Sequence, residues 1–291
     1  MEIKIFDVDR GFCAVVITDD HRTILLDSGY SHTGFRPSQY IVQKHCNSLE
    51  CLIVPAYTEE HLSGFADLLN QSLEHCLPIH FYLANPSVDA EKFPGLQRLN
   101  QRFKNALAFM SDTPPGVGST QVMKIDDVAI SFFWNNYSEF QDADNLSLVT
   151  FLSYRDINII FPSNLQTAGW LSLLKSPHFC DRLRQVNIFV AANHGKEDGY
   201  CPSVFDYCKP EVIIVSNELE QPISPRMMQR YQSHAHGSPL GVSHKKLLTT
   251  YDEGTITITK YLDRLRQVQT QLQDRKNTAA QFLEFEYINL N

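Results

Sequence analysis

Short apolar runs of strand length recur along almost the whole chain and alternate with segments of helical periodicity. Because hairpin-like pairs of runs and strand–helix units occur in both halves, the pattern predicts two sheets packed face to face with helices outside. The strand-like runs are residues 3–8, 14–17, 23–26, 49–54 and 79–83, then 128–134, 147–152, 157–161, 186–191 and 212–215, and finally 247–250 and 255–259.

The helical segments are predicted at residues 37–46, 62–75, 94–109, 168–174 and 225–231, with a shorter one near 204–207. No linker rich in Pro, Gly and Ser separates the two halves, so residues 1–260 are predicted to form a single α/β domain. The halves resemble each other in element order, although no short sequence repeat accompanies this.

Residues 261–291 differ from the rest of the chain. A stripe of Leu262, Leu265, Val268 and Leu272 predicts an amphipathic helix over residues 261–274, and residues 282–290 alternate as a strand does. Two interpretations stay open for this extension. It docks on the domain, or it forms an interface with a protein partner or a second copy of the chain.

Composition excludes several classes of protein. The 291 residues are 43% hydrophobic and 20% charged, which is typical of a globular chain. The net charge of −8 argues against an extensive nucleic-acid surface. No apolar stretch is long enough to span a membrane, and the first residues do not have the form of a signal peptide. Seven Cys without a CxxC pair indicate reduced thiols, so we expect a cytoplasmic protein.

Five short segments, taken in order, point to a family. They are residues 6–11 followed by 25–29, Asn145 with the apolar run after it, His194-Gly195 with Gly199-Tyr200, and residues 249–250 followed by 254–258. In these segments the chain resembles the metallo-β-lactamase superfamily. It is most similar to the bacterial branch that includes the soluble domain of the competence protein ComEC and related stand-alone metallohydrolases.

The resemblance covers residues 1 to about 260 and implies a four-layer αβ/βα sandwich. It also implies two metal ions between the sheets, commonly zinc or manganese. Metals of this kind lower the pKa of a shared water, which then attacks a phosphodiester or an amide-like carbonyl. The ligands expected from the resemblance are His and carboxylate side chains on the loops that follow strands.

The first ligand loop departs from the family pattern of His-x-His/Asp-x-Asp-His. This chain has Ala56, Thr58, Glu60 and His61 at those positions. Alanine cannot bind a metal, threonine is a poor neutral ligand, and Glu60 carries its carboxylate one methylene further from the backbone than Asp would. Only His61 matches the pattern.

The other ligand loops also depart from it. Where the family has Gly-Asp, with the carboxylate that bridges two metals, this chain has Ser163-Asn164. The His-His-Gly segment is Asn193-His194-Gly195, and Gln221 stands where a His often precedes a Pro. The resemblance assigns Asp27 a supporting role, in which it orients the backbone of the metal loop, although a turn Asp that bonds its own backbone would look the same.

These departures predict a degenerate, non-catalytic protein without a bound metal, which acts as a binding or regulatory subunit. The alternative is a metal-dependent hydrolase, of phosphodiesterase or nuclease type, with a reduced site. In that case one zinc or manganese ion would be held by Glu60, His61 and His194, with Asn164 as a weak ligand or a neighbour of the ligands.

The most basic part of the chain follows residue 225. Arg226, Arg230, His234, His236 and Lys245 could together hold a phosphate group, which would suit a nucleotide-like ligand. The alternative interpretation is a solvated face that balances a nearby acidic one.

Overall fold

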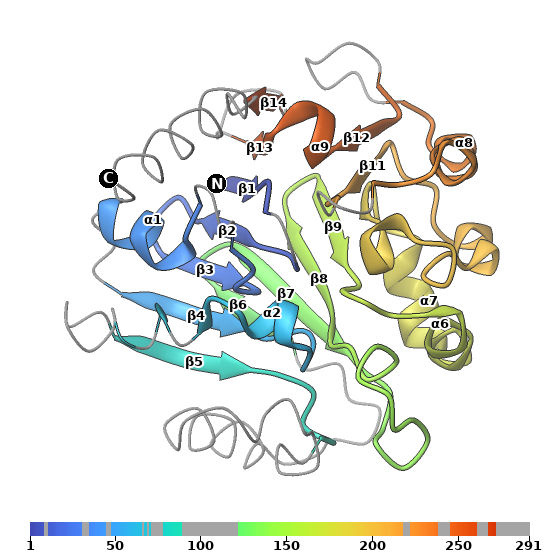
Figure 1. The fold of residues 1–291 in the computed structure, drawn as a ribbon, viewed down its shortest axis with the longest axis horizontal. Helices are drawn as coiled ribbons and strands as arrows, with labels where there is room; N and C mark the ends of the chain where they lie inside the picture. Colours follow the sequence, from blue (N-terminus) through green and yellow to red (C-terminus); the bar gives the residue numbers. More distant parts are fainter. Residues whose placement is uncertain are drawn as a thin grey trace, which may run out of the picture.

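The computed structural model describes residues 1–8, 11–30, 35–44, 48–65, 67–68, 70, 78–88, 122–217, 222–237, 245–260 and 267–271. Within these ranges the chain forms two seven-stranded sheets (Figure 1). The predicted helix over residues 94–109, the strand over 282–290 and Gln221 lie outside the described residues.

The first sheet has the strand order β14-β13-β1-β2-β3-β4-β5. Its hairpin part is antiparallel, and β3, β4 and β5 run parallel to one another. The strands are β1 Glu2–Ile5, β2 Ala14–Ile17, β3 Thr23–Leu26, β4 Leu49–Ile53, β5 Ile79–Leu83, β13 Thr255–Thr259 and β14 Gln267–Gln271.

The second sheet has the order β12-β11-β10-β9-β8-β7-β6 and repeats this scheme. Strands β6 to β9 pair antiparallel, and β9 to β12 pair parallel. The strands are β6 Val122–Ile125, β7 Val128–Phe133, β8 Val149–Tyr154, β9 Ile157–Phe161, β10 Ile188–Val190, β11 Val212–Val215 and β12 Leu247–Thr249.

Helices cover the outer face of each sheet (Figure 1). Helices α1 and α2 contribute to a buried cluster with the first sheet, and α6, α7 and α8 contribute to one with the second. The helices are α1 Pro37–Gln43, α2 Glu59–Leu62, α6 Thr167–Leu173, α7 Pro177–Leu183, α8 Pro225–His234 and α9 Thr250–Glu253, with 3₁₀ turns η2 Ala192–Gly195 and η3 Pro202–Asp206.

The central core lies between the two sheets. It is built mainly from isoleucine, valine and leucine side chains of both sheets, such as Ile3 and Ile24 from one and Leu152 and Ile159 from the other, with a few aromatic rings among them. Together with the outer clusters, this core makes four layers in the order helix, sheet, sheet, helix. The predicted α/β class and αβ/βα order are therefore confirmed.

The structure differs from the sequence-based prediction at the C-terminal extension. Residues 267–271, predicted as part of an amphipathic helix, form β14, which pairs antiparallel with β13 from Thr255↔Gln271 to Thr259↔Gln267. The helical prediction rested on an apolar stripe alone. The backbone groups along the edge of β13 need hydrogen-bond partners, and a neighbouring strand supplies them.

Strand β6 and helices α7 and α9 were not predicted. Strand β6 and helix α9 have four residues each, which is too short for a hydrophobic period to show clearly, whereas α7 is as long as the predicted α1 and α6. Helix α7 does carry a local signal, since the Ser176 side chain accepts a hydrogen bond from the Phe179 backbone N–H and Pro177 follows at the first helical position.

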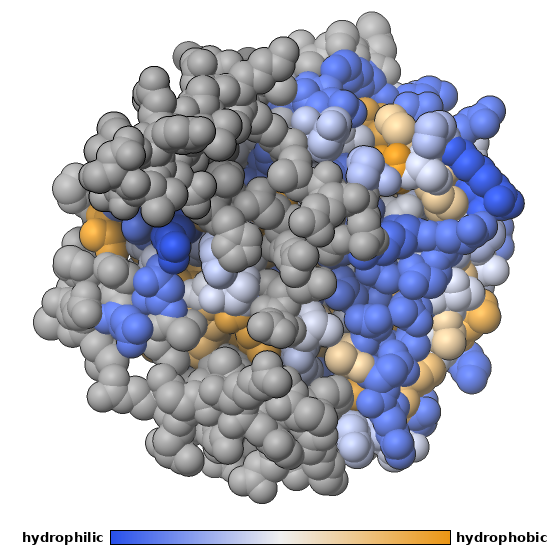
Figure 2. All heavy atoms as spheres, in the orientation of Figure 1, coloured by the Kyte–Doolittle hydropathy of each residue, from blue (hydrophilic) through white to orange (hydrophobic). Residues whose placement is uncertain are grey.

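The surface of the described residues is mostly polar. On the face in Figure 2, hydrophilic residues dominate the right-hand side, and apolar residues appear there as small separate spots. The large apolar side chains that are exposed, Phe81, Val122, Leu171 and Tyr251, belong to four different elements. None of the helices in the described ranges combines the length and apolar character needed to cross a bilayer.

A pair of leucine truncations tests the importance of the central core. Leu152 in β8 is fully buried between the sheets, whereas Leu171 in α6 is 48% exposed. We expect Leu152→Ala to lower the free energy of unfolding by about 2–5 kcal/mol, because it removes buried methyl groups and leaves a cavity. Leu171→Ala should change it by about 0.5 kcal/mol or less. Urea unfolding of both variants measures this, and equal effects would contradict the assigned core.

Candidate functional site

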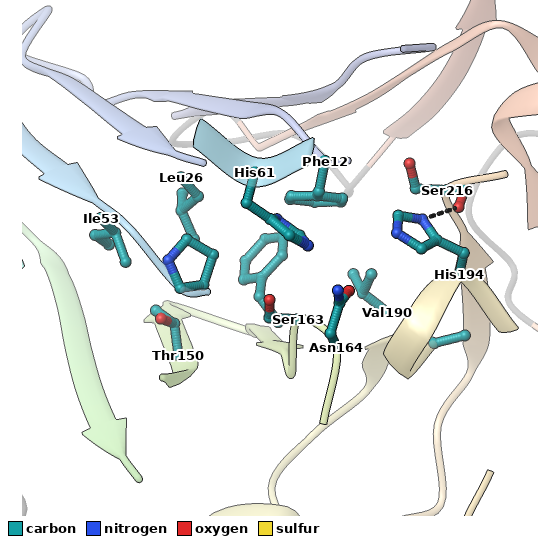
Figure 3. Close-up of a pocket in the computed structure, with 13 residues that line it drawn as sticks. Phe12, Leu26, Ile53, His61, Thr150, Ser163, Asn164, Val190, His194 and Ser216 are labelled. Atoms are coloured by element: carbon teal, nitrogen blue, oxygen red, sulfur yellow. Dashed lines mark hydrogen bonds between the residues drawn. The ribbon is translucent and has the colours of Figure 1, made fainter. Parts of the chain in front are cut away.

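A pocket lies between the sheets at the carboxyl ends of the parallel strands (Figure 3). Its cavity volume is about 20 Å³, which is room for about one water molecule. Ligands bind at this edge in α/β folds, because the loops that leave neighbouring parallel strands converge there. The lining residues are Phe12, Leu26, Ile53, Pro55, His61, Thr150, Phe161, Ser163, Asn164, Val190, Ala191, His194 and Ser216.

His61 is the first polar residue of this pocket. It lies on α2, is 1% exposed, and its Nδ1 forms a short hydrogen bond with Oδ2 of Asp27 at the end of β3. Burial raises the pKa of the Asp27 carboxyl, and the neighbouring His61 ring opposes this shift. A carboxylate on one ring nitrogen fixes the orientation of an imidazole and directs the other nitrogen elsewhere.

The turn after β3 is locked to α2 by further contacts. The Ser28 hydroxyl donates to the His61 carbonyl at 2.9 Å, and the Gly64 N–H donates to the Ser28 carbonyl at 2.9 Å. A Cβ on Gly64 would lie 2.3 Å from that carbonyl oxygen, so the close approach requires glycine. Asp27 therefore bonds the histidine ring itself, while Ser28 holds the backbone of the loop.

His194 faces His61 from the second sheet. It belongs to η2, directly after β10, and its Nδ1 lies 3.0 Å from the Ser216 carbonyl oxygen. A carbonyl can only accept a hydrogen bond, so Nδ1 carries a proton, and in the neutral form of the ring Nε2 is then the nitrogen with the lone pair. The two ring centroids are 6.2 Å apart with planes 27° from parallel, and Figure 3 shows the rings turned toward one another.

Backbone strain is concentrated around the same pocket. Asp27, Ser163, Asn193 and His194 have φ values of 66°, 56°, 45° and 55°, in the left-handed region that favours glycine. The other described non-glycine residues with positive φ, namely His21, Asp126 and Arg155, occur in the tight turns of β-hairpins. Strained residues of this kind persist where surrounding contacts hold them, and they cluster at binding sites.

Three hydroxyl groups of the pocket lack hydrogen-bond partners among the described protein groups. They belong to Thr150 in β8, Ser163 after β9 and Ser216 after β11. Thr150 is 1% exposed and Ser216 is 2% exposed. Burying a hydroxyl without a hydrogen-bond partner costs about 1–3 kcal/mol. Water or a ligand bound in the pocket would supply these three hydroxyls with hydrogen bonds.

Acidic residues stand behind the polar end of the pocket. The Asn164 amide donates to Asp144 at 3.4 Å, and the Gln166 amide donates to the same carboxylate at 2.9 Å. Burial raises the pKa of Asp144. On the other side, the Asn193 amide donates to Asp198 at 2.9 Å.

Sequence reasoning did not single out Asp144. The sequence did offer one signal for Asp144: it lies in the acidic segment 142–144, directly before Asn145 and the apolar run that supports the family resemblance. Which side of the loop faces the pocket depends on tertiary contacts. The buried side chains of Asn135 and Asn145 supply them, bonding the loop and the backbone of Gly169.

The donor set does not suit a two-metal centre. In the part of the chain that the structure describes, no three His, Cys, Asp or Glu side chains come together in a way that could hold a metal ion. His61 and His194 meet at the pocket with neutral Asn164, and Ala56 is buried without a donor atom. The side chain of Glu60 lies outside the described residues. Two dications need anionic ligands to offset their charge, and the described lining residues supply none.

The predicted phosphate-binding residues lie elsewhere. Arg226 and Arg230 both contact Glu197, at 3.8 Å and 3.1 Å, and Lys245 is paired with Glu253. His234 stacks on Phe205 with ring centroids 4.0 Å apart and bonds the Tyr200 hydroxyl at 2.7 Å, while His236 is exposed. None of these five residues lines the pocket.

Comparison with known proteins gives distant likenesses in structure. No family model matches the sequence, and no curated protein matches it. The metallo-β-lactamase fold protein YhfI from Bacillus subtilis is 8% identical over 85% of this chain and 95% of its own, with a TM-score of 0.49. The metallo hydrolase Igni18 from Ignicoccus hospitalis is 11% identical over 90% of this chain and 100% of its own, with a TM-score of 0.48. These low values assign neither a family nor an activity to the chain.

A pair of isosteric substitutions tests whether the buried Thr150 hydroxyl lacks a hydrogen-bond partner. We expect Thr150→Val to raise the free energy of unfolding by about 1 kcal/mol, because it removes a buried polar group that has no partner. Thr249→Val is the control. The Thr249 hydroxyl accepts from the Asp252 N–H at 3.0 Å and caps α9, so its loss should cost about 1–2 kcal/mol. Chemical denaturation measures both, and equal losses would show that the Thr150 hydroxyl is bonded.

Proposed function

We propose that this chain is a degenerate member of the metallo-β-lactamase superfamily, nearest the bacterial ComEC-like branch. In this proposal it binds a small ligand in the pocket between its sheets and does not hydrolyse substrates through a two-metal centre. It acts as a binding or regulatory subunit, and the residues of 261–291 outside β14 are where a protein partner or a second copy would dock.

The observation that carries this proposal is the pair Ser163-Asn164 at the pocket. Ser163 has a φ of 56°, the conformation that the family's glycine would favour, and Asn164 follows it in the pocket lining. The loop geometry thus supports the alignment with Gly-Asp, while the bridging carboxylate is replaced by an amide. An amide cannot supply the negative charge that holds two dications together.

A second candidate is a hydrolase with one metal ion. It is favoured by the anchoring of both imidazoles at Nδ1, through Asp27 and the Ser216 carbonyl, which is the usual support of metal-binding histidines. His61 and His194 would hold the ion, with Glu60 as a third ligand. A metal bound there would supply an activated water for hydrolysis of a phosphodiester.

Two measurements decide between these candidates: the metal content of the purified chain, and the zinc affinity of a variant in which a carboxylate is restored at position 164. We expect the purified chain to contain much less than one zinc or manganese per molecule, and His61→Ala to leave its metal content unchanged. Asn164→Asp returns a carboxylate to the pocket, so it should increase zinc affinity by about tenfold or more. Asp181→Asn, at an exposed position on α7, serves as a surface control.

Elemental analysis and zinc titration by calorimetry give the readout. One tightly bound metal per chain, lost in His61→Ala together with phosphodiesterase activity, would overturn the non-catalytic proposal and support the second candidate. Failure of Asn164→Asp to increase zinc affinity would contradict the assignment of position 164 to the lost carboxylate.

A further inference from the structure

We infer that the loop of residues 196–201 is held in place by an acid-sensitive latch, formed by the Tyr200 hydroxyl and the His234 ring. This regulation rests on the proposed binding function, because the loop supports η2 and with it the pocket residue His194. Three features support it: the contacts that the loop makes, the packing around His234, and the charges that face that ring.

The pocket end of the loop is bonded to Asn193, the residue before His194. The Lys196 N–H donates to the Asn193 carbonyl at 2.9 Å, and the Asn193 side-chain amide donates to the Asp198 carboxylate at 2.9 Å. Asn193 and His194 have positive φ values, so both need contacts that hold the backbone in this conformation. The loop supplies such contacts, and its release would leave η2 less constrained.

The middle of the loop is bonded to α6. The Thr167 N–H and hydroxyl both donate to the Asp198 carbonyl, at 2.8 Å and 2.9 Å. The indole Nε1–H of Trp170 donates to the Gly199 carbonyl at 3.1 Å. Trp170 is 1% exposed, so its indole N–H exchanges with solvent when the loop moves away. This N–H is therefore a reporter of the loop position.

The far end of the loop is held by the side chain of Tyr200. Its hydroxyl lies 2.7 Å from Nε2 of His234, the last residue of α8. The His234 ring stacks on Phe205 with centroids 4.0 Å apart and planes 4° from parallel, and the Tyr200 ring meets Tyr231 edge-on at 5.2 Å. The phenol can donate to Nε2 of a neutral imidazole. A protonated imidazole has no lone pair, so the phenol must then turn its hydrogen elsewhere.

The charged groups around His234 act in opposite directions. Lys209, just after η3, and Arg230, one turn earlier on α8 with its guanidinium 5.6 Å from the centroid of the Tyr200 ring, both disfavour a cation at this place. The Asp206 carboxylate on η3 favours one, as do the C-terminus of α8 and the face of the stacked phenylalanine. Burial among the aromatic rings prevails. Together with Lys209 it lowers the pKa of His234, and Asp206 opposes this shift.

Folding favours the neutral form of His234, because its pKa is lower in the folded chain than in the unfolded one. The stabilisation from the latch is therefore fully present above the ordinary histidine pKa of about 6.5, and it is lost as the pH falls through the lower pKa of the folded chain. Burial raises the pKa of Tyr200 and of Tyr231, so both phenols remain uncharged over this range. Acid thus acts on the latch through His234.

Nuclear magnetic resonance of the full chain follows the ring and the loop together between about pH 7.5 and about pH 5. We expect the His234 ring to titrate. The hydrogen-exchange protection of the Trp170 indole N–H, corrected for the intrinsic effect of pH, should fall about 3–10-fold with the same midpoint. His234→Gln keeps a side-chain acceptor that does not titrate, so its protection should lose this pH dependence. His178→Gln, which removes an exposed histidine on α7, should behave as the wild type.

A second substitution separates the hydrogen bond from the packing of the ring. His234→Phe retains an aromatic ring that can stack on Phe205 but removes the acceptor, so the protection of the Trp170 N–H should be reduced about 3–10-fold at every pH. Chemical denaturation shows whether each variant folds. If the phenylalanine variant does not fold, the glutamine variant still tests the latch by itself.

Several results would overturn the latch. An unchanged pH response in His234→Gln would assign the acid effect to other groups. Titration of His234 without a change at Trp170 would show that the bond does not hold the loop, and full protection in His234→Phe would show the same. Each of these results leaves the proposed function standing, because none of them involves a ligand or a metal. One tightly bound metal ion per chain would overturn the proposed function and leave the latch intact.

Discussion

Each of the two large sheets has an apolar face that must be buried, and the rest of the structure depends on how these two faces pack together. The side chains that meet between the sheets are mostly aliphatic, and both sheets contribute to them. This packing aligns the carboxyl ends of β3 and β4 with those of β9, β10 and β11 at one side of the sandwich. The polar loops that leave these strands must therefore meet there, and strained residues such as Ser163 and His194 are held in place by them.

Within that meeting point, a few hydrogen bonds set the chemistry. Asp27 and the Ser216 carbonyl each bind the Nδ1 side of a histidine, so the two rings present their other nitrogens to the same space. Asn164 in the pocket lining is a neutral amide, and the buried Ala56 has no donor atom. The acidic groups that remain, such as Asp144, stand one hydrogen bond further back. This arrangement keeps a negative environment without supplying direct anionic ligands for two metals.

Much of the fold could be predicted because strand patterns are local. The runs at 14–17, 23–26 and 157–161 coincide with β2, β3 and β9. The misses have physical reasons. Helix α9 has only four residues and is too short to show a period. Strand β14 pairs with the edge of β13 although its own sequence has helical spacing. Intrinsic periodicity describes one segment, whereas strand pairing depends on what lies beside it.

The sequence alone determined the alternation of apolar runs and with it the four-layer class. It also determined that Asn164 and Ala56 supply no charge wherever they lie. Only the tertiary structure decided that His61 and His194 face each other and that Asp144 lies behind the pocket, bonded to Asn164. It also decided that Arg226 and Arg230 are engaged by Glu197 away from the pocket. The reason is that composition and spacing fix the chemistry of each residue, whereas distances and proton positions depend on contacts between residues far apart in the chain.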